Sequence, residues 1–243
     1  MKTFVSFAIL LLTSCALFAA EPSAQFAKAN QEYASGDFQS AITDYEELVR
    51  AAQDAPNLFY NLGNAYFRKK DFGRSILNYE RALALNRHFA EAQANLRIAQ
   101  DEARALELLP SPSERLFAFA NENQLAMAAA ITFWIGIFAI AIFVFNRRRR
   151  FVALSIISLS IFAIAAIGVY QLRHGKNGNG LAIVTGESVE ARIATADNAN
   201  RVLTLPAGSE IKIVSQRGDW IYAALPNNLQ GWMPAKSAEQ VRM

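Results

Sequence analysis

The chain has 243 residues, of which 53% are hydrophobic, and its mean hydropathy of +0.13 is high for a soluble protein. Its net charge is only +3, and no broad basic stretch with interleaved aromatics is present, which argues against a nucleic-acid partner. One cysteine, Cys15, and two histidines, His88 and His174, cannot supply a Cys/His zinc site, and no motif around them indicates a catalytic triad. We therefore expect a protein that is not an enzyme, with no metal and no cofactor.

Residues 1–20 are typical of a secretory signal peptide, because a lysine precedes a short apolar run and small residues follow it. Ser14-Cys15-Ala16 fits a small-x-small cleavage site, and cleavage a few residues later is an alternative. Leu12-Thr13-Ser14-Cys15 also resembles a bacterial lipobox, in which Cys15 would carry a lipid. An uncleaved anchor is the third alternative, and it would leave the topology unchanged.

Two long apolar segments lie past the middle of the chain, at residues 125–145 and 151–170, and neither contains a charged side chain. At 1.5 Å per residue, each segment is long enough to cross about 30 Å of hydrocarbon. A buried helix of a soluble protein rarely continues so far without a polar stripe. The two segments therefore predict a two-helix transmembrane hairpin.

A run of arginines separates these segments, in a loop at residues 146–150. The run consists of Arg147, Arg148, Arg149 and Arg150. Short loops follow the positive-inside rule strongly, and the outer flanks of the hairpin carry fewer cations. We expect the arginines to anchor the loop in the cytoplasm, so that both large flanking segments lie in the periplasm. A nucleic-acid or nuclear-localisation patch is the alternative, and the flanking apolar runs argue against it.

The segment at residues 21–109 contains an internal repeat with a period of 34 residues. The matched groups are Gly36-Asp37-Phe38 with Lys70-Asp71-Phe72, and Tyr45-Glu46 with Tyr79-Glu80. This is the period of the tetratricopeptide repeat (TPR), and residues 57–86 resemble its pattern closely. We expect two antiparallel helix pairs followed by a capping helix at 90–106. Gly63 and the small Ser75 would let the helices of the second pair approach closely.

TPR helix stacks usually bind a peptide or a helix of a protein partner in their concave groove. The first-helix side chains that we expect to line this groove are Asn30, Asn61, Asn64, Phe67, Arg68 and Asn95. Asn64 and Arg68 lie four residues apart and share a helix face. We expect both to point away from the helix seam, so that replacing them should leave folding nearly unchanged.

Two of these asparagines, Asn30 and Asn61, match positions of the carboxylate-clamp TPRs, which hold the C-terminus of a peptide. The lysines of that clamp are missing, because Phe26 and Glu91 stand where positive charge is needed. A carboxylate is bound tightly only by paired cations, so we do not expect a clamp here.

Residues 181–243 follow a linker at 171–180 and alternate β-branched runs with turn signals. Leu205-Pro206-x-Gly208, Asp219-Trp220-Ile221-Tyr222 and Gly231-Trp232-Met233 together resemble the bacterial SH3-like barrel. The resemblance implies an aromatic groove for proteins or cell-wall peptides, with Trp220, Tyr222 and Trp232 as the candidates. Packing in the core of a small domain is the alternative for the two tryptophans. We interpret Arg217-Gly218-Asp219 as a turn between strands, rather than as an integrin-binding tripeptide.

The order of these parts, including a linker at 110–124, resembles that of the BatE-type proteins of bacterial aerotolerance operons. The strings GNAYFRKKDFGRSILNYERALALN, ANLRIA and GWMPAKSAEQV carry the resemblance. It implies an inner-membrane protein whose partners are von Willebrand A-domain membrane proteins and, indirectly, a MoxR-type ATPase.

The sequence thus predicts a multidomain membrane protein with an all-α TPR solenoid, a transmembrane hairpin and a small all-β SH3-like barrel. We expect a scaffold that presents its TPR groove and its SH3-like module to the periplasm. The alternative is an envelope protein that binds peptidoglycan through the SH3-like domain.

Overall fold

The computed structural model describes residues 24–117, 119–175 and 178–242. The chain divides into two compact units, with the boundary between Asp54 and Ala55. The predictions for the signal segment at 1–20 and for a lipid on Cys15 lie outside the described residues.

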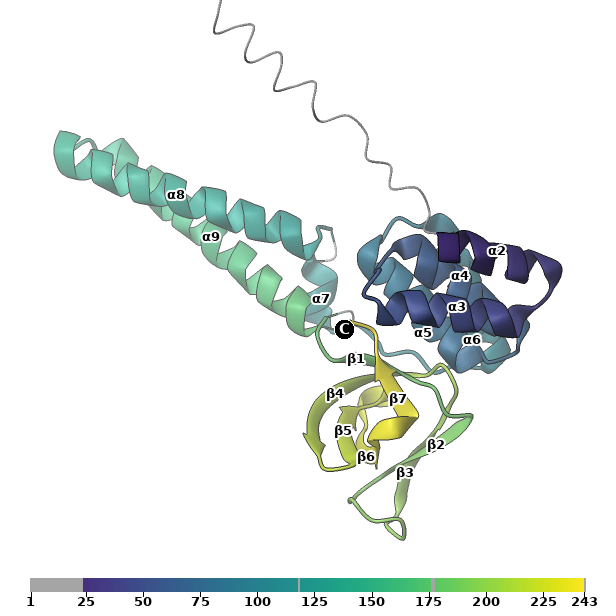
Figure 1. Cartoon of the computed structure of the whole chain (residues 1–243). Helices are drawn as coiled ribbons and strands as arrows, with labels where there is room; N and C mark the ends of the chain where they lie inside the picture. Colours follow the sequence, from purple (N-terminus) through teal and green to yellow (C-terminus); the bar gives the residue numbers. More distant parts are fainter. Residues whose placement is uncertain (1–23, 118, 176–177, 243) are drawn as a thin grey trace, which may run out of the picture. The chain divides into compact units, whose positions relative to one another are not determined.

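The first unit is an antiparallel helix pair, in which α2 (Ala24–Ser35) and α3 (Phe38–Arg50) lie side by side (Figure 1). Gly36, with φ of 89°, makes the tight turn between them. A buried carboxylate, Asp44, pairs with Lys28 of α2 at 2.7 Å, and this hydrogen bond raises the pKa of Lys28. The pair therefore joins the two helices by an ion pair as well as by apolar packing.

The second unit begins with three helices, the first two of which repeat the design of the first unit. These helices are α4 (Pro56–Arg68), α5 (Phe72–Leu85) and α6 (Ala90–Ala103). Asp71 caps the start of α5 through its side chain, as Asp37 caps α3, 34 residues earlier. The predicted close approach of α4 and α5 is present, because the Ser75 hydroxyl donates to the Gly63 carbonyl at 2.9 Å.

An apolar hairpin of two antiparallel helices follows (Figure 1). Its helices are α8 (Glu122–Asn146) and α9 (Arg149–His174), and the short α7 (Pro112–Phe117) precedes them. Both long helices begin earlier and end later than the predicted spans, and only Arg147 and Arg148 connect them. The predicted linker at 110–124 contains a helix of its own, α7. Both long helices are long and apolar enough to cross a membrane.

The C-terminal part is a seven-stranded antiparallel sheet in the order β3-β2-β6-β5-β4-β1-β7. The strands are β1 (Leu181–Val184), β2 (Ser188–Arg192), β3 (Arg201–Pro206), β4 (Glu210–Arg217), β5 (Trp220–Ala224), β6 (Gln230–Pro234) and β7 (Ala238–Gln240). The end strands of this ladder, β3 and β7, are not paired with each other among the described residues. The antiparallel sheet is thus confirmed, whereas the predicted closed barrel is not.

Helices α5 and α6, before the apolar hairpin, share a hydrophobic core with strand β1, after it. Ile76 and Leu77 of α5 and Leu96 of α6 pack in the same cluster as Leu181 and Ile183 of β1. Each of these side chains is buried. The second unit is therefore one folded body on both sides of the hairpin in sequence, whereas the sequence predicted separate TPR and SH3-like domains.

The chain leaving α6 adds backbone pairing to this shared core. Arg104, with φ of 50°, ends α6 three residues before the predicted end. The next residues run along the start of β4, where the Glu210 amide donates to the Leu106 carbonyl at 2.8 Å. The Leu108 amide donates to the buried Glu210 carboxylate at 2.8 Å, and the Leu106 amide donates to the Ser209 hydroxyl at 3.1 Å. These bonds fix the exit of α6 to the sheet.

Candidate protein-binding surfaces

The same tyrosine–asparagine hydrogen bond occurs in each of the two repeated helix pairs. In the first unit, the Tyr45 hydroxyl donates to Asn30 Oδ1 at 2.6 Å. In the second, the Tyr79 hydroxyl donates to Asn64 Oδ1 at 2.7 Å. Both tyrosines are 1% exposed, so each hydroxyl is buried and needs an acceptor. The asparagine 15 residues earlier supplies that acceptor in both pairs.

A polar network extends from Asn64 across three helices. The Asn95 amide of α6 donates to Asn64 Oδ1 at 2.9 Å and to the Tyr60 hydroxyl at 3.3 Å. The Tyr60 ring lies 4.9 Å from that of Phe89, just before α6. The expectation that Asn64 points away from the helix seam is therefore wrong, because its side chain accepts bonds from α5 and α6.

Tyr60 belongs to this network, although it was not among the predicted groove residues. The spacing in the sequence could have indicated this, because Tyr60 lies one helical turn before Asn64 and shares its helix face. Amide and hydroxyl groups of this kind can bond the backbone of a bound peptide. The side chains of this network therefore offer hydrogen bonds to a partner. The network contains no nucleophile with an adjacent base.

Three other predicted groove residues, Asn61, Phe67 and Arg68, lie on α4 in different surroundings. Asn61 is half-buried, and Arg68 is exposed at the last position of α4. Phe67 packs on the shared core, and its ring meets that of Phe72 at 5.5 Å. Asn30 belongs to the first unit, and the other five predicted groove residues belong to the second. Arg68 is the only charged side chain among the six predicted groove residues.

The residues that replace the clamp lysines differ in their surroundings. Phe26 packs inside the first helix pair, with its ring 5.9 Å from that of Tyr45. Glu91 is exposed in the first turn of α6. Neither supplies the cation that a peptide carboxylate requires.

A second candidate surface is the outer face of the sheet. On β5, Trp220 and Tyr222 are half-buried and alternate with the buried Ile221, and on β6 Trp232 precedes the buried Met233. Because side chains alternate between the faces of a strand, the three aromatics lie opposite the core. The core of the sheet does not include them.

The Tyr222 and Trp232 rings lie against each other, with their centroids 5.0 Å apart. The two residues are register partners on β5 and β6. Arg192 of β2 is the register partner of Trp232 on the other side and is held by Glu190 at 3.0 Å. An aromatic pair beside an arginine is an arrangement suited to stacking on a ligand.

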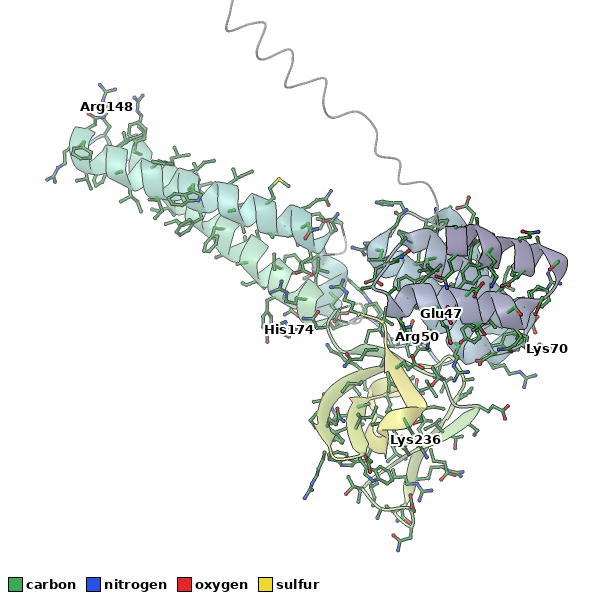
Figure 2. The ribbon with its side chains drawn as sticks, viewed as in Figure 1. Glu47, Arg50, Lys70, Arg148, His174 and Lys236 are labelled. Carbon is green, nitrogen blue, oxygen red and sulfur yellow. The ribbon has the colours of Figure 1, made fainter. Side chains whose placement is uncertain are left out.

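The arginines lie at one end of the apolar hairpin, and Figure 2 shows Arg148 and His174 at its opposite ends. All four arginines are exposed. At the other end, the His174 ring stacks on that of Tyr170 at 4.3 Å. In the part of the chain that the structure describes, no three His, Cys, Asp or Glu side chains are grouped as metal ligands.

Two protein-family models match the chain. The model described as "TPR repeat" matches residues 29–70, and the model described as "Tetratricopeptide repeat" matches residues 56–89. These matches extend from within α2 to just past α5, and they confirm the TPR repeats predicted from the 34-residue period. No curated protein matches the chain.

Proposed function

We propose that this protein is a non-enzymatic scaffold of the bacterial inner membrane, which holds protein partners on the periplasmic side. One observation carries the proposal: α5 and α6, before the apolar hairpin, share a core with β1, after it. The TPR repeats indicate protein partners, because stacked helix pairs bind peptides and helices of other proteins.

The exposure of the hairpin supports its insertion in a bilayer. Within the most apolar window of each helix, only 17% of the residues of α8 and 22% of those of α9 are buried. The core helix of a soluble protein would bury most of such a window. Exposed side chains such as Trp134, Phe138 and Ile157 are therefore matched to lipid rather than to water.

The shared core supports the topology independently of the arginines. A core of packed side chains cannot continue through about 30 Å of hydrocarbon, so both flanks of the hairpin must lie on one side. Two crossings return the chain to that side. The arginine end marks the cytoplasmic side by the positive-inside rule, which leaves the TPR helices and the sheet in the periplasm.

The resemblance to BatE-type proteins gives the proposed partners a class. We propose that the TPR surface, including Asn61 and Arg68, binds a von Willebrand A-domain membrane protein. A MoxR-type ATPase would act on the same complex indirectly, within an aerotolerance or envelope-stress system. The charged end of Arg68 would pair with an acidic side chain of the partner.

Reporter fusions test the topology. Alkaline phosphatase folds only after export, so we expect activity from fusions after Ala105 and at the C-terminus. A fusion after Arg148 should be inactive, because it leaves the reporter in the cytoplasm. Activity after Arg148, or none at either flank, would remove the topology and the proposal that depends on it.

A second candidate function is peptidoglycan binding through the sheet. The observation that favours it is the outward Tyr222–Trp232 pair, which lies opposite the core and beside Arg192. In this function the module resembling an SH3-like domain binds a stem peptide of the wall, and the TPR helices are secondary.

Paired variants of the full-length protein separate the two functions. If it is a scaffold, Arg68→Ala should weaken co-purification of the von Willebrand A-domain partner by about tenfold, the loss of one charge-assisted bond. Lys69→Ala, an exposed cation one residue further along, serves as the matched control. If it is a wall binder, Tyr222→Ala with Trp232→Ala should abolish binding to purified sacculi. Wall binding lost in this way, with partner capture unaffected by Arg68→Ala, would favour the second function.

A further inference from the structure

Three large apolar side chains between α6 and α8 are exposed outside the apolar hairpin. Leu109 is 72% exposed, Leu116 is 74% and Phe119 is 79%. Among the described large hydrophobic residues, only Phe145, near the arginine end of the hairpin, is more exposed. A water-facing linker has no need of such side chains, and polar residues would serve it better.

Contacts of α7 place this segment against one end of the hairpin. The ring of Phe117 occupies the space beside Gly168 of α9, where a Cβ on Gly168 would come within 2.6 Å of it. The Ser113 hydroxyl donates to the Gln171 side chain, also of α9, at 3.3 Å. The contacts with α9 thus extend from Gly168 to Gln171, close to its end at His174.

This level is where the apolar surface of the hairpin gives way to polar groups. The apolar run of α9 ends at Tyr170, which is 61% exposed, and Arg173 then pairs with Glu122 of α8 at 3.1 Å. From Gly168 to His174 the helix rises by about 9 Å. Exposed tyrosines and charged pairs at such a level are typical of the membrane–water interface.

We infer that Leu116 and Phe119 insert into the outer leaflet of the bilayer at the level of its headgroups. The occupant of this surface is lipid, because α7 packs through Phe117 and Ser113 against the end of α9, at the level where the apolar surface of the hairpin meets polar groups. Short amphipathic segments reach about 5–10 Å into the boundary between headgroups and acyl chains. Leu116 and Phe119 then belong to a membrane-surface anchor rather than to a linker. The inference rests on the proposed insertion of the hairpin.

Spin labels on the full-length protein test this inference. In a Cys15→Ala background the rest of the chain has no cysteine, so single cysteines can be introduced at Leu116 and Phe119. The purified protein is reconstituted in phosphatidylethanolamine–phosphatidylglycerol vesicles, without any protein partner. Collision rates with oxygen and with a water-soluble nickel chelate then give the depth of each label.

Two further positions serve as controls. One is Ile98→Cys on α6, outside the hairpin, where the isoleucine side chain is 51% exposed. The other is Ile157→Cys on α9, within the hairpin, where the isoleucine side chain is 58% exposed. We expect labels at 116 and 119 to lie about 5–10 Å below the headgroup boundary, and the label at 98 to lie in water.

Each other outcome overturns a distinct statement. Labels at 116 and 119 that match the label at 98, while 157 lies in lipid, would overturn this inference alone. A label at 157 in water would overturn the proposed membrane insertion itself. Dipolar broadening at 116 that disappears on dilution with unlabelled protein would assign the surface to a second copy of the chain instead of to lipid.

Discussion

Gly208→Ala destabilises the second unit by about 2–5 kcal/mol, and two separate effects contribute. Gly208 has φ of 81°, a conformation that costs a residue with a side chain about 1–2 kcal/mol. A Cβ at this position would also overlap Cδ1 of Ile76 on α5. Ile76 is fully buried, so the overlap adds about 1–3 kcal/mol of overpacking.

Gly218→Ala is the matched control, because it reproduces the first effect without the second. Gly218 has φ of 56° in the turn between β4 and β5, and nothing lies within 4 Å of the position of its Cβ. Its cost should be about 1–2 kcal/mol. Native-state hydrogen exchange of the full-length protein in micelles measures both, through the amides of α5 and β1.

Ile76→Val combined with Gly208→Ala completes the experiment. The valine lacks the Cδ1 methyl that overlaps the new side chain, so the double variant should be more stable than the sum of the single costs predicts. Equal costs for Gly208→Ala and Gly218→Ala, or strict additivity with Ile76→Val, would show that the β3–β4 turn does not pack on α5. The shared core would then no longer require both flanks of the hairpin to lie on one side of the membrane.

The helical repeat and the apolar hairpin could be predicted because their signals are local. The 34-residue match of Asp37 with Asp71 places two residues that cap equivalent helices. The arginine run likewise falls between two segments whose length alone indicates a membrane span. Patterns of this kind depend on periodicity, which a single sequence contains.

The shared core and the polar network were missed because they depend on distant residues. Leu106 meets Ser209 across 103 positions, and Leu108 meets Glu210 across 102. No periodicity links such residues. A polar residue such as Asn64 is assigned to a solvent-facing groove by its type, unless the buried hydroxyl that it bonds is known.

Tyr79→Ala should destabilise the second helix pair by about 3–5 kcal/mol, the cost of removing a large aromatic side chain from a packed core. Tyr79 is 1% exposed, and its ring fills the space beside Gly63, where a Cβ would come within 2.8 Å of two ring atoms. Gly63→Leu should do similar harm by forcing that ring aside. Protection of α5 amides in the full-length protein is the measurement. A helical fragment ending at Leu109 is unsuitable, because it lacks the part of the core contributed by β1.

The contribution of the Tyr79 hydroxyl to stability can be measured separately from that of its ring. Tyr79→Phe removes the hydroxyl that donates to Asn64 and keeps the ring, so it should cost about 1 kcal/mol. Asn64→Ala removes the acceptor for both Tyr79 and Asn95, and we expect about 1–2 kcal/mol. Because both single changes break the same bond, the double variant should cost less than their sum by at least about 0.5 kcal/mol. Additive costs would mean that Asn64 does not hold Tyr79. In that case Asn64 would return to the list of side chains available to a bound partner, and Asn64→Ala would join Arg68→Ala as a test of capture rather than of folding.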